Sequence, residues 1–139
     1  MNRVVVDASA LVEYLLKTEA APAMAATLTR PGTDLHVPAL CDIEVVSAFR
    51  GAMIRGYLSE ARVDEALQDF LALPLFRHGH QALLPRCLAL KHALSAYDAT
   101  YVALAESLAA PLLTGDLRLA RTARRLGVQC LPESELDLL

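Results

Sequence analysis

Four acidic residues stand at positions where one fold could bring them together: Asp7, Glu44, Asp98 and Asp116. Clustered carboxylates repel one another and raise one another's pKa unless a cation neutralises them. Oxygen ligands with no nearby Cys or His favour a hard ion, hence Mg²⁺ or Mn²⁺ rather than zinc. Such an ion lowers the pKa of a bound water and stabilises charge on a phosphoryl oxygen. This chemistry suits phosphodiester hydrolysis, and it does not by itself identify the substrate.

Each acid also has a purely structural interpretation. Asp7 could end a strand or cap the helix that follows, and Asp116 is a natural N-cap. Ser95-x-x-Asp98 fits a capping box, and Glu44 could be a solvated helix residue. Taken singly, each of these structural roles is the more probable one, and only the joint pattern favours a functional site.

Strands and helices alternate along the chain. Strands are expected at 4–6, 35–37, 73–76, 112–114 and 128–131, and helices at 9–17, 20–28, 39–55, 59–71, 81–94, 95–109 and 116–126. Pro85 either kinks the helix at 81–94 or delays its start. This alternation favours a three-layer α/β/α domain with a central parallel sheet of four to five strands, spanning residues 1–139 as one domain. Right-handed crossovers place the carboxyl ends of the strands along one edge, and all four acids can project toward it.

The overall charge gives no reason to expect nucleic-acid binding. The 139 residues are 55% hydrophobic and carry a net charge of −3, so any contact with a nucleic acid requires a local basic patch. Arg118, Arg121 and Arg125 share one helix face and form a candidate phosphate track. A solvated helix surface is an equally good interpretation. Arg77, His78 and His80 form a smaller cluster with the same potential.

The chain shows no sign of export or membrane insertion. Asp7 interrupts the amino-terminal apolar run too early for a signal peptide, and no apolar run approaches the ~18 residues of a membrane span. The three cysteines are far apart and form no CxxC pair, so we expect reduced thiols in a cytoplasmic protein.

Four segments resemble the PIN-domain ribonucleases, and VapC-type toxins of toxin–antitoxin systems in particular. Val4 to Leu11 is similar to the opening of PIN domains, a hydrophobic strand running into D-x-S. Residues 38–48, which contain Glu44, resemble the second motif of the family. Residues 95–105, with the sequence SAYDATYVALA, are the most specific match, and Leu112 to Asp116 resembles the T-x-D element. The four matches occur in the family's order and span nearly the whole chain.

The resemblance implies a PIN-like fold and an acidic pocket that holds one or two divalent ions, Mg²⁺ or Mn²⁺. It implies that Asp7, Glu44, Asp98 and Asp116 bind metal and position the attacking water, and that Ser9 and Thr114 support the site through hydroxyl hydrogen bonds. The implied activity is endonucleolytic cleavage of RNA by a metal-activated water, as the toxin of a toxin–antitoxin pair. Some PIN domains carry another acid two positions after the T-x-D aspartate, where this chain has Arg118. That departure puts a second metal ion in doubt.

The resemblance also implies partners. VapC-type proteins pair with a small antitoxin, whose tail lies in a hydrophobic groove and sends a basic side chain into the acidic pocket. Two apolar stripes are candidates to line such a groove, although the core is the better interpretation for most of their members: Leu11, Tyr14 and Leu15, and Val46, Phe49 and Met53. A homodimer is implied as well, and no membrane partner is expected.

Three other functions are weighed against this interpretation. A haloacid-dehalogenase-type phosphatase requires a second Asp where Ser9 stands. A receiver-type phosphoacceptor requires an acidic pair after the first strand and a Lys near the last, and neither is present. The stronger alternative is a PIN-like module that binds RNA or protein without cutting it. Four mutually repelling carboxylates argue against that module, and metal-induced stabilisation would separate the two possibilities.

Overall fold

The computed structural model describes residues 2–133. Its strands are β1 (Asn2–Val6), β2 (Thr33–Pro38), β3 (Leu75–His78), β4 (Leu112–Leu113) and β5 (Cys130–Leu131). Its helices are α1 (Ala8–Leu15), α2 (Ala21–Leu28), α3 (Cys41–Ile54), α4 (Glu60–Ala72), the 3₁₀ turn η1 (Gln81–Leu83), α5 (Leu84–Ala89), α6 (Ala96–Leu108) and α7 (Leu117–Arg125).

The five strands form one parallel sheet in the order β3-β2-β1-β4-β5. The predicted α/β fold class is therefore confirmed. The chain first builds outward from β1 to β3 and then returns to the other side of β1 to form β4. This reversal creates a crevice between the carboxyl ends of β1 and β4, which is where parallel α/β sheets place their binding sites.

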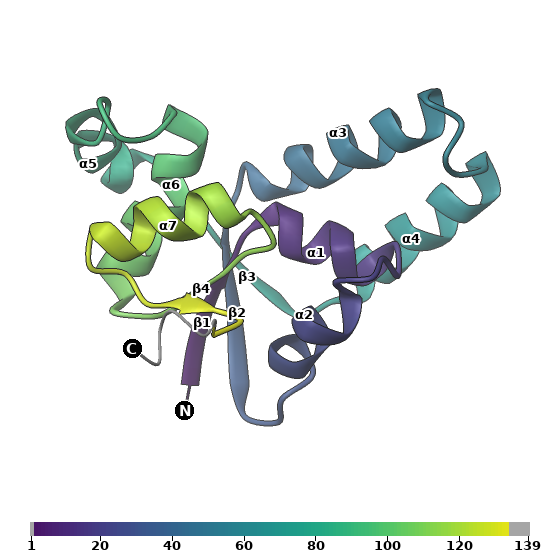
Figure 1. Ribbon diagram of the computed structural model, residues 1–139, viewed down its shortest axis with the longest axis horizontal. Helices are drawn as coiled ribbons and strands as arrows, with labels where there is room; N and C mark the ends of the chain where they lie inside the picture. Colours follow the sequence, from purple (N-terminus) through teal and green to yellow (C-terminus); the bar gives the residue numbers. More distant parts are fainter. Residues whose placement is uncertain (1, 134–139) are drawn as a thin grey trace.

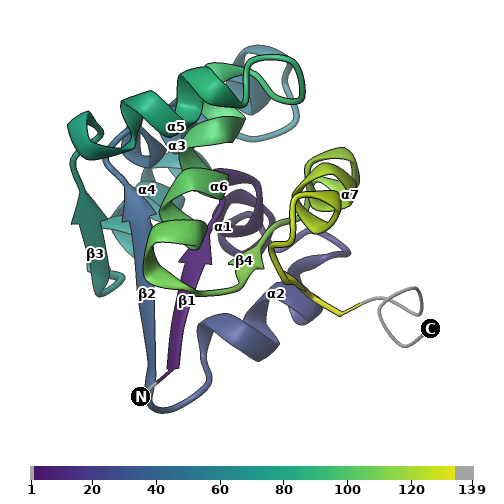
Figure 2. The same ribbon diagram turned by 90° about the vertical axis from the view of Figure 1, so that its left-hand side faces the viewer.

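Helices cover both faces of the sheet (Figures 1 and 2). α6 packs on β1, β2 and β4, and α5 packs against α6. On the other face α2 contacts β2, and α1 packs against α2, α3 and α4. α3 and α4 lie side by side and extend together away from the sheet (Figure 1).

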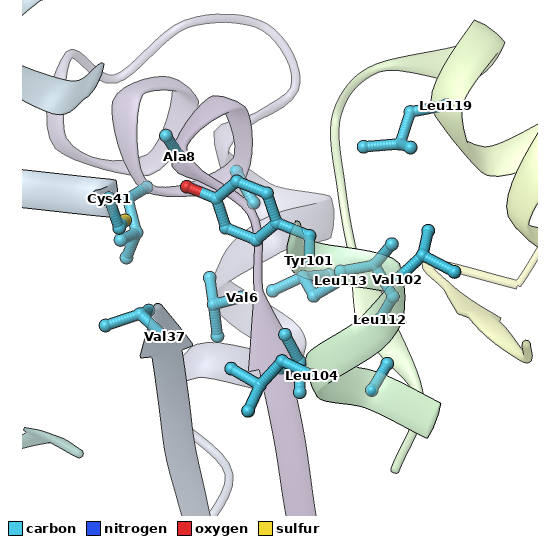
Figure 3. Packing of buried hydrophobic residues seen from close by; sticks show 14 of the residues in the cluster. Val6, Ala8, Val37, Cys41, Tyr101, Val102, Leu104, Leu112, Leu113 and Leu119 are labelled. Atoms are coloured by element: carbon cyan, nitrogen blue, oxygen red, sulfur yellow. The ribbon is translucent and has the colours of Figure 1, made fainter. Parts of the chain in front are cut away.

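The centre of the core lies between β1 and α6. Val4, Val5 and Val6 are all buried, as expected for a strand covered on both faces. In α6 every residue from Ala99 to Ala105 is buried, so this helix is enclosed on all sides. Figure 3 shows the Tyr101 ring among these side chains, with its hydroxyl oxygen directed toward Ala8 and Cys41. A polar atom of α6 therefore reaches the edge of the sheet where β1 ends.

Most predicted elements are present with limits that differ by up to two residues, and one helix and one strand need a physical explanation. The helix expected at 81–94 is a 3₁₀ turn followed by a short α5 that ends at Ala89, and Pro85 occupies its first turn. The late start caused by Pro85 is confirmed, and the predicted length is wrong. The third strand lies two residues further along than predicted, because Pro74, which lacks an N–H, precedes it rather than interrupting it. Between residues 2 and 133, no helix is both long and apolar enough to cross a membrane.

Candidate active site

Asp7 is a buried carboxylate held by two hydroxyl groups. It immediately follows β1, and its side chain lies in the crevice beside β4 with 6% exposure. Ser9 Oγ and Thr114 Oγ1 both donate hydrogen bonds to Asp7 Oδ2, at 2.5 and 2.8 Å. Because both hydroxyls approach the same oxygen, Oδ1 is left for another partner. The structure thus places the hydroxyls of Ser9 and Thr114 against the buried carboxylate of Asp7.

The loop after β4 is tied to the same hydroxyls. Gly115 N–H donates to Ser9 Oγ and Asp116 N–H donates to Thr114 Oγ1, both at 3.0 Å. Asp116 Oδ1 accepts from the backbone N–H groups of Arg118 and Leu119 at 3.0 and 3.1 Å, so Asp116 does cap α7. Asp116 therefore caps α7 and also lines the same cavity as Asp7.

Asp98 is positioned by the start of α6. Ser95 is the N-cap, and its hydroxyl oxygen accepts from Asp98 N–H at 3.1 Å. This hydrogen bond uses the backbone of Asp98, so its carboxylate is available to the crevice. Of the two hydrogen bonds of the predicted capping box, the one from Asp98 N–H to the Ser95 hydroxyl is present. It leaves the Asp98 carboxylate out of the cap.

Glu44 lies in the first turn of α3 and is held from across the molecule. Tyr101 Oη donates a 2.6 Å hydrogen bond to Glu44 Oε1. Tyr101 lies one helical turn after Asp98, so one face of α6 supplies both an acid and the hydroxyl that orients another. Sequence reasoning did not single out Tyr101 as a site residue, although its i+3 spacing from Asp98 was a usable signal.

All four acids line one cavity of about 360 Å³. Its remaining walls come from Ala8, Ser9, Val12, Glu13 and Ala48. Glu13 was not predicted as a site residue. It lies one helical turn after Ser9, and its Cγ is 3.4 Å from where a Cβ on Gly115 would stand. A fifth carboxylate therefore borders the same cavity.

The acids affect one another's ionisation. Burial raises the pKa of Asp7 above its ordinary value, the two hydroxyl hydrogen bonds oppose this, and the charges of Asp98 and Asp116 add to it. Burial also raises the pKa of Glu44, against the Tyr101 hydrogen bond. Asp98 has a raised pKa through burial and the nearby charge of Asp116, partly offset by Arg118. These carboxylates are therefore close enough for ionising all of them to be unfavourable without a counter-ion.

The donor set of the cavity fits a hard divalent cation. Its ligating atoms are carboxylate and hydroxyl oxygens, and the nearest thiol, Cys41, has its pKa raised by burial to about 12, which keeps it protonated. Among residues 2–133, no three acidic, imidazole or thiol side chains already converge closely enough to hold an ion.

The arginines of α7 lie beside this cavity. Arg118, Arg121 and Arg125 are all exposed, and only Arg118 contributes a charge that acts on Asp98. Arg125 is also hydrogen-bonded to Thr122 at 3.2 Å. A row of exposed arginines thus begins just after Asp116 and continues along α7, and its role as a phosphate track stays a prediction.

The smaller basic cluster is engaged in structural contacts instead. Arg77 forms an ion pair with Asp42, with 2.9 Å between Nε and Oδ2. His78 Nε2 lies 2.9 Å from His36 Nδ1, and His80 Nε2 accepts from Leu40 N–H at 3.0 Å. These contacts fasten edge strand β3 to its neighbours, and they account for Asp42, to which no role was assigned from the sequence.

Fold and site together define an α/β domain whose acidic centre lies where the strand order reverses. The PIN domain family model matches residues 4–125. The chain is 43% identical over 121 residues to ribonuclease VapC3 of Mycobacterium tuberculosis, covering 86% of this chain and 87% of the relative. It is 40% identical over 119 residues to ribonuclease VapC12 of the same organism, covering 86% and 91%. The protein belongs to the PIN domain family.

Solved structures share the fold at low sequence identity. PAE2754 from Pyrobaculum aerophilum has a TM-score of 0.66 at 22% identity, covering 94% of this chain and 84% of that one. VapBC2 from Rickettsia felis, bound to a DNA fragment from its promoter, has a TM-score of 0.64 at 12% identity, covering 92% and 96%.

Proposed function

We propose that the protein is an endoribonuclease that hydrolyses RNA phosphodiester bonds with the help of a divalent cation, Mg²⁺ or Mn²⁺, and acts as the toxin of a toxin–antitoxin pair. The convergence of Asp7, Glu44, Asp98 and Asp116 on one cavity carries the proposal. The relatives named as VapC ribonucleases support RNA as the substrate.

Each residue of the site has a role in this proposal. The four acids would hold the cation, with Asp7 fixed by Ser9 and Thr114, and Glu44 by Tyr101. A divalent cation bound there would lower the pKa of a coordinated water and offset charge on a phosphoryl oxygen. The acids orient the attacking water, while Arg118, Arg121 and Arg125 bind phosphates of the RNA strand. The 2′-hydroxyl is not needed as nucleophile, so a 2′-deoxy nucleotide at the cut site should still be cleaved.

A cleavage assay tests this proposal. A mixed cellular RNA pool is incubated with Mg²⁺ or Mn²⁺, with EDTA, and with Asp98→Asn in place of the wild-type protein. We expect discrete fragments that disappear in both controls. Intact RNA at high protein and metal concentration, or cleavage that EDTA does not affect, would instead favour the non-catalytic binding module.

The antitoxin completes the proposal as a partner. An apolar cavity of about 440 Å³ is lined by residues of α1, α2 and the end of α4, among them Tyr14, Leu15, Pro22, Ala72 and Leu73. Of the two predicted stripes, Leu11, Leu15 and Phe49 are buried, while Tyr14 borders this cavity. We assign the antitoxin's apolar segment to it and expect Tyr14→Ala to weaken the complex in a co-purification assay without abolishing cleavage.

The proposed homodimer is tested separately, by sedimentation velocity. The exposed side chains Leu84 and Leu88 lie four residues apart on α5 and provide an apolar face for a second copy. A sedimentation coefficient of the monomer at micromolar concentration would remove the dimer from the proposal.

A further inference from the structure

Three of the four acids that line the cavity have a large, exposed apolar residue next to them in the sequence. Ile43 precedes Glu44 and is 72% exposed, Tyr97 precedes Asp98 and is 66% exposed, and Leu117 follows Asp116 and is 73% exposed. None of the three contributes to the core. Large apolar side chains that stay exposed next to the acids of a cavity indicate a contact surface for something that approaches those acids.

Tyr97 is the aromatic one of these three residues, and the start of α6 fixes its backbone. It is the second residue of α6, whose start is set by the Ser95 cap. Neighbouring residues on a helix point in different directions, so Tyr97 does not share the direction of Asp98. Asp98 lines the cavity and Tyr97 does not. The exposed ring therefore lies outside the acidic cavity, on the residue that directly precedes one of the lining acids.

A positive charge lies near the same point. Arg118 lies in the first turn of α7, and its backbone N–H donates at 3.0 Å to Asp116 Oδ1, whose residue lines the same cavity as Asp98. Aromatic rings bind nucleobases by stacking, and guanidinium groups bind phosphates. The two side chains beside Asp98 therefore match the two chemically different parts of a nucleotide.

On the basis of the ribonuclease function proposed above, we propose that Tyr97 stacks on an unpaired base of a nucleotide adjoining the scissile phosphate. The ring of Tyr97 is then a specificity-determining element that selects single-stranded RNA. Bases in an A-form helix are stacked on one another, and their faces are not available to a side chain. Because every base has a π face, Tyr97 selects unpaired nucleotides and tolerates different base identities.

The test compares the two most exposed tyrosines of the described chain. Tyr57 is 73% exposed, lies in the loop between α3 and α4, and is not next in sequence to any of the four acids. Tyr97→Ala, Tyr97→Leu, Tyr97→Phe and Tyr57→Ala are each made in a Glu44→Gln background, in which the glutamine oxygen can still accept from Tyr101. Fluorescence anisotropy with Mg²⁺ present measures the affinity of each for a labelled single-stranded oligoribonucleotide of mixed sequence, and for the same strand in a duplex.

We expect Tyr97→Ala to weaken single-strand binding about tenfold, the loss of one base–aromatic stack. Tyr97→Leu should weaken single-strand binding equally. Tyr97→Phe and Tyr57→Ala should bind the single strand with the affinity of the Glu44→Gln parent. The affinity for the duplex should be the same in all variants. Equal single-strand affinity in Tyr97→Ala and Tyr57→Ala would overturn the inference. So would full rescue by Tyr97→Leu, or dissociation of a dimer by Tyr97→Ala with RNA affinity unchanged. If the parent binds no RNA at all, the proposed function fails as well, and that result is recognised before any variant is compared.

Discussion

Asp7 is the residue whose environment conflicts most with its charge. It is buried, next to other carboxylates, and its pKa is raised. The folded protein therefore holds a proton on Asp7 at pH values where the unfolded chain has released it. It follows that ionised Asp7 destabilises the metal-free fold at neutral pH, and that this cost disappears as the pH falls to the ordinary value of 3.8.

Asp7→Asn tests this account at the residue scale. Asparagine can still accept from Ser9 and Thr114, so we expect the metal-free variant to be more stable at pH 7 by on the order of 1 kcal/mol. The gain should shrink as the pH falls toward 4, and RNA cleavage should be lost. Urea unfolding at several pH values measures the effect, with Asp64→Asn on the exposed side of α4 as control. A variant that is less stable than wild type at every pH would contradict it.

Tyr101→Phe tests how Glu44 is positioned. The Tyr101 hydrogen bond favours ionised Glu44, so its loss should raise the pKa of Glu44 further. Glu44 then stays protonated to higher pH, and the acidic limb of the kcat/KM profile should move upward. At neutral pH we expect a severalfold loss of activity. An unchanged pH profile with lower stability would reduce Tyr101 to a packing role.

At the scale of elements, the starts of the helices position the acids. α6 begins at the Ser95 cap and α4 at the Ser59 cap, whose hydroxyl accepts from Arg62 N–H at 3.1 Å. The two caps have the same chemistry, and only that of α6 lies next to a site residue. Substituting each cap in turn therefore separates the effect of a cap on stability from its effect on the position of Asp98.

Ser95→Ala and Ser59→Ala should each lower the free energy of unfolding by about 1 kcal/mol. Only Ser95→Ala should also lower kcat, since Asp98 lies in the turn that loses its cap. Thermal unfolding and single-turnover cleavage of both variants check this expectation. Equal losses of activity would mean that the helix start does not control Asp98.

The sequence predicted the elements that end at the site better than the contacts between them. The valines before Asp7 and the leucines before Thr114 identify the two central strands, and their parallel pairing places Asp7 and Asp116 at one edge. The positions of Glu44 and Asp98 at this edge follow from the predicted starts of the helices in whose first turns they lie. The hydrogen bond from Tyr101 to Glu44 joins residues 57 positions apart, and no local pattern encodes such a distance. The length of α5 was also not predictable, because an apolar helical pattern continues past the point where packing ends the helix.

At the scale of the whole molecule, a modest net charge of −3 conceals an uneven distribution. Carboxylates gather in one crevice, and arginines line the adjoining helix α7. Overall composition therefore says little about nucleic-acid binding in this fold, because the cation and the α7 arginines would act locally.

Raising the ionic strength should weaken RNA binding steeply. A triple Arg118→Ala, Arg121→Ala and Arg125→Ala variant should have a smaller slope of log affinity against log salt by about 3. An unchanged slope would make α7 a plain solvated surface.

The central claim is that the acidic crevice binds a divalent cation, and calorimetric titration with Mn²⁺ tests it most directly. Wild-type protein and Asp7→Asn are titrated at pH 7 in two buffers of different ionisation enthalpy, with Asp64→Asn as control. We predict saturable binding to wild type and Asp64→Asn, a matching rise in Tm, and greatly weakened binding to Asp7→Asn; the two buffers separate the enthalpy of cation binding from that of any proton exchange. No binding to the wild-type protein, or equal binding to Asp7→Asn, would contradict a metal centre built on these four acids.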